Sequence, residues 1–186
     1  MDIQIHQLES KNLDEILELQ AKSLKTTSSH YNQRQIESLI QSQKAARLAF
    51  NETLFVADYQ GKLVGFAALQ SNKPEIGGLF VHPDYMRQGI GTKLIETIEN
   101  QALAEKYTKL YVLSSLAAVD FYQTRSYKMI CKSGFISEWD TWIPCLLLEK
   151  SLLTNTEIEN TIYQITGLIG WILNDFFNNK SSFITS

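Results

Sequence analysis

The sequence predicts one mixed α/β domain over residues 1–153, followed by a helical extension over residues 154–186. Three observations support this prediction. Strand-like and helix-like apolar periods alternate along the first part of the chain, and a glycine loop joins one predicted strand to one predicted helix. The 186 residues also have ordinary globular composition, with 44% hydrophobic and 20% charged side chains. A chain of this length can bury a substantial core.

The N-terminal part of the chain predicts a short strand followed by two helices. Residues 3–8 alternate apolar and polar side chains as a half-buried strand does, and Asn12 is placed to cap a helical period over residues 13–19. A polar, turn-rich stretch over residues 23–32 comes next, and the helical period begins again at residues 36–40. We therefore expect a helix, a loop and a second helix here.

Three β-rich runs occupy the middle of the chain. Residues 54–58 and 62–69 are separated by a short hairpin signal at residues 59–61, and residues 75–81 predict a further strand. The glycine pair 77–78 lies inside that third strand. Glycines inside a strand indicate a bulge or the close approach of another segment.

The last part of the domain continues the alternation of strands and helices. Residues 109–113 predict a strand, and the serine pair 114–115 is placed to cap a helix that contains residues 118–122. Residues 127–133 and 141–148 predict two final strands, joined by an acidic turn that carries tryptophan.

The composition excludes several classes of function. The net charge of -3 and the pI of about 5.6 remove the electrostatic attraction that non-specific nucleic-acid binding needs, so we expect no nucleic-acid partner. The chain has only two cysteines and three histidines, with no CxxC pair and no zinc-like spacing. We therefore expect no metal site and two reduced, structurally inert thiols.

The N-terminal residues lack the basic, apolar and small-residue pattern of a signal peptide. The expected location is the cytoplasm.

The glycine loop over residues 81–92 carries the first signal for chemistry. After Gly89, apolar residues recur at helical spacing, namely Ile90, Leu94, Ile95, Ile98 and Ala102. Glycines allow successive main-chain N–H groups to point into one concavity, and the N-terminus of the following helix adds positive potential. Such a loop can bind a pyrophosphate. A plain turn from strand to helix is the alternative, because a single GxG is weak evidence.

Two separated motifs carry a family resemblance. Residues 80–92, with Arg87-Gln88-Gly89-Ile90-Gly91-Thr92, and the later run Ala118 to Tyr127 resemble the GCN5-related N-acetyltransferase (GNAT) family, in the family's element order over residues 3–153. The resemblance implies a mixed, mostly antiparallel central sheet with flanking helices. It also implies that acetyl-CoA is the co-substrate of an N-acetyltransferase. The helix predicted after residue 153 lies outside this fold.

The sequence departs from the family pattern at two positions. The family usually has Gln or Arg at the leading position of the loop, where this chain has Met86, so Arg87 is the candidate for the missing charge. A glycine usually precedes the aromatic residue at the end of the second motif, where this chain has Ser126. We expect Ser126 to change the exit from the helix more than the chemistry.

The resemblance also assigns cofactor contacts. In the family, the strand matching residues 75–81 splays from the strand matching residues 109–113, and the pantetheine arm lies in the gap. The main-chain N–H groups of residues 79–81 would then stabilise the oxyanion of the acetyl carbonyl. The expected cofactor-binding residues are Leu79, Phe80, Val81, Arg87, Gln88, Gly89, Ile90, Gly91 and Thr92.

Tyr122 is the candidate general acid. A phenol with a pKa of about 10 is protonated at neutral pH and can give a proton to the departing thiolate. The family match favours this role. Without that match, a core aromatic residue beside Phe121 is the better interpretation.

Glu75 is the candidate general base, because it begins the strand at which the family often places a carboxylate, and partial burial would raise its pKa. An exposed glutamate at a strand end is the alternative. His82 is a weaker candidate, since a residue before proline more often packs at a strand end.

The acceptor pocket is expected to use the early loop and the late hairpin. His30 and Tyr31 lie in the first, and the run Glu138-Trp139-Asp140-Thr141-Trp142 lies in the second. Acidic and tryptophan side chains suit a small cationic amine. A protein N-terminus or lysine is an open alternative, as is a catalytically silent acyl-CoA-binding module with a regulatory role.

The tail carries apolar residues in steps of four and three, namely Ile158, Ile162, Ile165, Ile169, Ile172 and Phe176. Its uncharged run over residues 160–174 is shorter than the roughly 20 residues that a membrane span needs. A homodimer contact and a helix packed on its own domain both fit this pattern.

Overall fold

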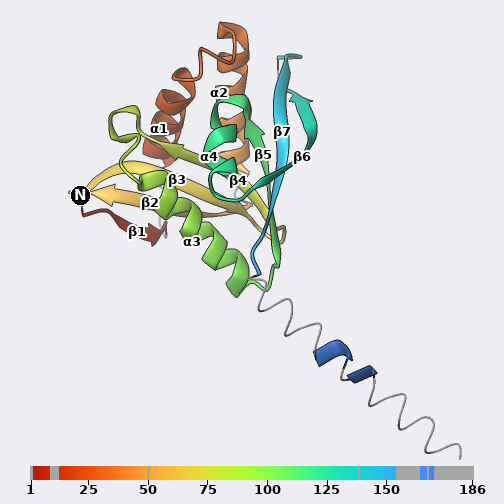
Figure 1. Cartoon of the computed structure of the whole chain (residues 1–186). Helices are drawn as coiled ribbons and strands as arrows, with labels where there is room; N and C mark the ends of the chain where they lie inside the picture. The colour runs from red at the N-terminus through yellow and green to blue at the C-terminus, as the bar shows by residue number, and fades with distance from the viewer. Residues whose placement is uncertain are drawn as a thin grey trace, which may run out of the picture. The chain divides into compact units, whose positions relative to one another are not determined.

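Among the described residues, seven strands form one sheet in the order β1-β2-β3-β4-β5-β7-β6 (Figure 1). The computed structural model describes residues 2–8, 13–49, 51–137, 139–153, 164–166 and 168–169. Only β4 and β5 pair in parallel among these strands, so the sheet is mixed and mostly antiparallel as expected. The strands are β1 (Gln4–Gln7), β2 (Glu52–Tyr59), β3 (Lys62–Gln70), β4 (Glu75–Val81), β5 (Lys109–Ser115), β6 (Lys128–Ile136) and β7 (Trp142–Ser151).

The helices are α1 (Leu13–Lys25), α2 (Gln33–Leu48), α3 (Ile90–Ala104) and α4 (Val119–Gln123), with 3-10 turns η1 (Pro83–Tyr85) and η2 (Leu116–Ala118). Asn32 caps α2 through a capping box with Gln35. The predicted cap Asn12 lies outside the described residues. The prediction that the serine pair 114–115 caps the next helix is wrong: Ser115 makes no capping hydrogen bond, and the Ser114 hydroxyl donates to the Ser115 carbonyl.

The helices cover both faces of the sheet, which explains why the strands alternate between two cores. On one face, Leu94 and Ile98 of α3 pack in a cluster with Val64 and Ala67 of β3. On the other face, the α1 side chains pack against a different set of strand residues that includes Phe66. The residues of α2 pack further along the same face, against β7.

The sheet opens between β4 and β5, and this opening positions the site. Gly78 is opposite Ala68 and Ile76 is opposite Leu69, so Gly77 is the extra residue of a β-bulge. β4 pairs with β5 only at its first two residues, whereas β5 stays paired with β7 along its whole length. The predicted bulge and the predicted splaying of the two strands are therefore confirmed.

The chain divides into two compact units, Met1–Leu152 and Leu153–Ser186. In the second unit, residues 164–166 and 168–169 have helical backbone, as the predicted extension requires. Most of the apolar stripe lies outside the described residues, namely Ile158, Ile162, Ile172 and Phe176. The dimer contact stays a prediction. Within the described part of the chain, no helix has the length and apolar character needed to cross a membrane.

Candidate active site

A cleft of about 380 Å³, here called the central cleft, lies beside the diverging end of β4. Four parts of the chain meet around it: the end of α1 with the loop that follows, the end of β4, the glycine loop, and α4 with the turn before it. Its lining includes Ser29, His30, Leu79, Phe80, Val81, Met86, Arg87, Gly91, Ser115, Phe121 and Tyr122. The two motifs separated in sequence therefore face one cleft.

A second, smaller cavity of about 100 Å³, here called the inner cavity, lies in the gap between β4 and β5. It shares Leu79, Phe80, Ser115 and Tyr122 with the central cleft, so the two spaces adjoin. The inner cavity extends to Gln43 of α2. Tyr122 thus lines both spaces at the point where they meet.

The glycine loop presents a row of free main-chain donors. Among the described residues, no acceptor receives a hydrogen bond from the main-chain N–H groups of residues 87–92. Gly89, the N-cap of α3, has a left-handed φ of 84° and supplies no side-chain cap. The positive end of α3 is therefore open to an anion, and these donors fit a pyrophosphate.

The side chains of the loop contribute less than its backbone. Arg87 is exposed and has a left-handed φ of 61°. The Gln88 amide nitrogen donates to the Asp84 carbonyl oxygen at 3.2 Å, so this side chain is held within its own turn. Ile90 is 1% exposed and belongs to the core, which leaves only its main chain for a ligand.

Arg125 joins α4 to the start of α3, and sequence reasoning did not single it out. Its guanidinium donates to the hydroxyl of Thr92 and, at 2.8 Å, to the carbonyl oxygen of Phe121. The Thr92 hydroxyl is therefore already engaged. The position of Arg125 three residues after Tyr122, inside the second motif, was the available signal.

The end of β4 directs two main-chain N–H groups toward the opening. The N–H of His82 donates to the Val64 carbonyl oxygen at 2.9 Å, and hydrogen bonding alternates along an antiparallel pair. The N–H of Phe80 therefore points toward β3. The N–H groups of Leu79 and Val81 point to the opposite side, from which β5 has diverged. Two of the three expected donors point into the opening.

Tyr122 is 4% exposed and lies edge-on to two aromatic rings, those of Phe121 at 5.2 Å and Tyr127 at 5.3 Å between centroids. Burial raises the pKa of the Tyr122 phenol above its usual value of 10. The hydroxyl is consequently protonated at neutral pH, as a proton donor must be.

Neither predicted base lines the central cleft or the inner cavity. Glu75 is partly buried at the start of β4, opposite Tyr111. The His82 ring nitrogen Nδ1 accepts a hydrogen bond from the Asp84 N–H at 3.3 Å, and its side chain is only 12% exposed. His82 thus packs at the end of the strand, as its position before Pro83 indicated.

The early loop reaches the site, but the tryptophan hairpin does not. His30 lines the central cleft, with its Nδ1 2.8 Å from the Ser29 hydroxyl. Trp139 and Trp142 are 43% and 53% exposed, and they line neither the central cleft nor the inner cavity. Glu138 lies outside the described residues.

Tyr31 has a structural position beside the site. Its hydroxyl donates to the Pro144 carbonyl oxygen at 2.8 Å and accepts from the Leu116 N–H at 2.9 Å. Burial raises the pKa of Tyr31 to about 12. Tyr31 therefore ties the loop after α1 to the ends of β5 and β7, rather than offering its hydroxyl to a substrate.

The comparisons with known proteins agree with this geometry. A family model described as "Acetyltransferase (GNAT) domain" matches residues 23–147, which is more than half of the chain. The protein therefore belongs to the GNAT family: it is an N-acetyltransferase that uses acetyl-CoA as co-substrate. No curated protein sequence matches the chain significantly.

Solved structures share the fold. A crystal structure described as a GCN5-related N-acetyltransferase (aminotransferase, class II) from Rhodopseudomonas palustris has 27% identity and a TM-score of 0.73, covering 81% of this chain and 96% of that chain. PaiA N-acetyltransferase from Thermoplasma acidophilum, in complex with coenzyme A, has 19% identity and a TM-score of 0.64, covering 81% and 99%. The ribosomal-protein-S18-alanine N-acetyltransferase from Escherichia coli has 17% identity and a TM-score of 0.55, covering 82% and 96%.

Proposed function

We propose that this enzyme transfers the acetyl group of acetyl-CoA to the primary amine of a small molecule, by direct attack in a ternary complex. The observation that carries the proposal is the central cleft, where the free N–H groups of the glycine loop, the open edge of β4 and the phenol of Tyr122 meet. Each of these features supplies one requirement of acetyl transfer.

The main chain provides the proposed binding of acetyl-CoA. The pyrophosphate would accept hydrogen bonds from N–H groups of residues 87–92, with added attraction from the exposed Arg87. The pantetheine arm would lie along the open edge of β4. The N–H groups of Leu79 and Val81 would then face the thioester carbonyl and stabilise its oxyanion.

The proposed reaction needs one proton donor and one proton acceptor. The amine nitrogen forms a bond to the carbonyl carbon, the carbon–sulfur bond breaks, and coenzyme A leaves as a thiolate. Tyr122 gives its phenolic proton to the thiolate and recovers one from solvent. The proton lost by the amine goes to a base, for which Glu75 is the proposal.

Glu75 would act through water. It precedes Leu79 by four residues on one strand, a separation of about 13 Å at roughly 3.3 Å per residue. It also lies outside the lining of both cavities. A direct hydrogen bond from the acceptor to Glu75 is not part of the proposal.

The described residues that line the central cleft indicate the charge and size of the proposed acceptor. It contains His30 and Arg87 but no carboxylate, so the proposed acceptor need not carry a second positive charge. Its attacking amine must be neutral when it attacks. The volume of about 380 Å³ suits a small molecule that shares the cleft with the end of the pantetheine arm.

The test is release of coenzyme A from acetyl-CoA across a panel of small amines, compared with peptides that offer an N-terminus or a lysine. We expect sustained release with at least one small amine. Release only with peptides would overturn the small-molecule acceptor. Acetyl-CoA binding without release in any reaction would instead support a silent binding module.

A matched pair of loop variants tests where acetyl-CoA binds. Gly89→Asn and Gly89→Asp both tolerate the left-handed conformation at this position, and they differ mainly in charge. We expect the aspartate variant to bind acetyl-CoA at least about tenfold more weakly than the asparagine variant, because one negative charge would face the phosphates. Equal affinities of the two variants would show that the phosphates of acetyl-CoA do not bind at this loop.

A further inference from the structure

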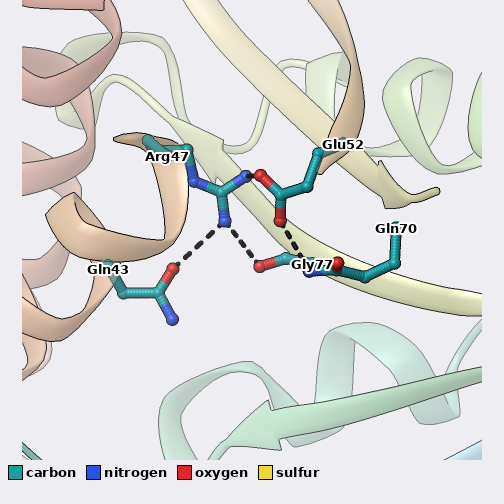
Figure 2. Close-up of polar contacts among 5 residues, drawn as sticks. All are labelled: Gln43, Arg47, Glu52, Gln70 and Gly77. Atoms are coloured by element: carbon teal, nitrogen blue, oxygen red, sulfur yellow. Dashed lines mark hydrogen bonds and ion pairs between the residues drawn. The ribbon is translucent and has the colours of Figure 1, made fainter. Parts of the chain in front are cut away.

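A buried ion pair contacts the β-bulge of β4 directly (Figure 2). Arg47, near the end of α2, pairs with Glu52, the first residue of β2, and their side chains are 0% and 4% exposed. The Arg47 guanidinium also donates to the carbonyl oxygen of Gly77 at 2.7 Å and to the Gln43 amide oxygen at 3.3 Å. Gln70 donates to the Glu52 carboxylate at 2.7 Å. Elements distant in sequence thus converge on the bulge.

The glycine pair and the ion pair fit one another. A Cβ atom on Gly77 would overlap the Glu52 carboxylate and would lie 2.8 Å from the Gln70 amide nitrogen. A Cβ atom on Gly78 would lie 2.7 Å from the ring of Phe80 and 3.1 Å from a guanidinium nitrogen of Arg47. Glycine is needed at position 77 because Glu52 and Gln70 pack against its main chain, and at position 78 because the Phe80 ring and Arg47 do.

Stability alone does not account for this arrangement. Burial lowers the pKa of the Arg47 guanidinium, the attraction of Glu52 acts in the opposite direction, and arginine keeps its charge at neutral pH. Apolar residues of similar volume can often replace a buried ion pair at no cost in stability. The guanidinium, however, supplies something that apolar residues lack, namely a donor for the carbonyl of the extra residue in the bulge.

The bulge is the point at which β4 leaves β5. Glu75 and Ile76 pair with β5, and the residues after them do not. Gly77 therefore begins the segment whose later N–H groups, those of Leu79 and Val81, face the opening. Gln43, another acceptor of Arg47, lines the inner cavity beside the same segment.

We propose that Arg47 is a positioning residue for acetyl transfer: by holding the carbonyl of Gly77 it fixes the open geometry of β4 and the direction of the N–H groups of Leu79 and Val81. This role rests on the proposed function of those two groups. Arg47 acts through the main chain of β4 and does not contact the reacting atoms.

The first test uses kinetics. Arg47→Met combined with Glu52→Gln removes both charges, so neither is left buried without its partner. We expect kcat to fall by about 10²-fold, the scale associated with small misplacements of groups around the reacting atoms. The affinity for acetyl-CoA should fall by less than about tenfold, because the variant disturbs the β4 edge along which the pantetheine arm would lie but leaves the glycine loop untouched. Arg47→Lys, which keeps one charged donor, should recover part of kcat.

A matched control separates positioning from loss of stability. Lys150→Met breaks a second ion pair, which is less deeply buried and is made with Glu99 of α3; neither residue lines the central cleft. We expect this control to lower the melting temperature and to keep kcat. If the double variant also keeps its kcat, or if the control loses as much, the positioning role is wrong.

The second test does not depend on turnover. Hydrogen–deuterium exchange of the β4 segment should be at least about tenfold faster in the double variant, while exchange in β6 stays unchanged. Unchanged exchange in β4 would overturn the role of Arg47 even in an active enzyme. If the wild-type protein acetylates no amine, the proposed function fails, and the exchange result still decides whether Arg47 holds the bulge.

Discussion

Arg125 lies over the ring of Phe121, with its guanidinium carbon 3.9 Å from the ring centroid. The ring of Phe121 also contacts the start of α3, where a Cβ atom on Gly91 would lie 3.0 Å from it. Together with the hydrogen bond from Arg125 to Thr92, this contact joins the helix that carries Tyr122 to the loop proposed to bind the phosphates. These contacts hold the helix of Tyr122 and the glycine loop at a fixed distance from one another.

We predict that Arg125→Met weakens acetyl-CoA binding by roughly tenfold, or about 1.4 kcal/mol. The reason is that the variant loses three donated hydrogen bonds and frees the first turn of α3 from α4. Titration calorimetry measures the effect. Arg34→Met is the control, because Arg34 donates two hydrogen bonds to the hairpin at Trp139 and Thr141 and does not join α4 to α3. Equal affinities in the two variants would contradict the prediction.

Tyr122→Phe should lower kcat by about 10² to 10⁴-fold, the usual contribution of a general acid, and should leave acetyl-CoA binding nearly unchanged. Tyr127→Phe is the matched control. Tyr127 is buried beside Tyr122, but its hydroxyl donates to Glu99 at 3.1 Å instead of facing the cleft. We expect that variant to lose stability and keep kcat. Full activity of Tyr122→Phe would show that Tyr122 is a core aromatic residue without a catalytic role.

The pH profile gives a second readout of Tyr122. Its pKa is raised above 10 by burial, so the phenol remains protonated throughout the neutral and mildly alkaline range. Ionisation of Tyr122 should therefore not lower the kcat of the wild type between pH 7 and 10. The kcat profiles of the wild type and Tyr122→Phe should have the same shape in this range. A fall below pH 10 that this substitution abolishes would show that the phenol ionises more easily than its burial implies.

Local patterns predicted most elements of this fold. The predicted bounds of β4 agree with the observed ones because its glycine pair, its flanking proline and its apolar run all belong to one segment. The glycine loop was recognisable because a loop that can bind phosphate through its main chain leaves its signature in consecutive residues. Each of these features depends on interactions between residues close in sequence.

Other features depend on tertiary contacts that local patterns do not record. Arg47 is a residue type that is normally exposed, and its burial on the inner face of α2 depends on Glu52 and the Gly77 carbonyl, which meet it there. The acidic and tryptophan side chains of the late hairpin predicted a site for a substrate ammonium. Arg34 and Gln35 of α2 instead bind the main chain of that hairpin, which holds it away from the cleft.

Alkaline pH should destabilise the protein, partly through Tyr31. The folded-state pKa of about 12 exceeds the unfolded value of 10, so this stabilising contribution is complete below pH 10 and is lost as the pH rises toward 12. We predict that the melting temperature falls less between pH 8 and 11 in Tyr31→Phe than in the wild type. Loss of the Tyr31 hydrogen bonds lowers the melting temperature of the variant at both pH values, so this effect cancels when the two falls are compared. Equal falls would show that Tyr31 does not contribute.

Ser126 and Lys106 both occupy positions that favour glycine. Each follows a helix with a left-handed φ, 68° for Ser126 and 67° for Lys106. The N–H of the next residue donates to the carbonyl five residues earlier, from Tyr127 to Tyr122 and from Tyr107 to Ala102. These bonds define Schellman motifs, in which glycine is the usual residue because it has no Cβ atom. Ser126 does therefore affect the helix exit.

We predict that Ser126→Gly and Lys106→Gly each stabilise the protein by about 1 kcal/mol, since a side chain in the left-handed conformation costs roughly 1–2 kcal/mol and added chain entropy offsets part of the gain. The melting temperature should rise by about 2–4 °C for each substitution. Ala45→Gly, at an exposed position inside α2, is the control and should cost about 1 kcal/mol. If all three substitutions lower the melting temperature, the strain at the two helix exits is already relieved by their surroundings, and the prediction is wrong.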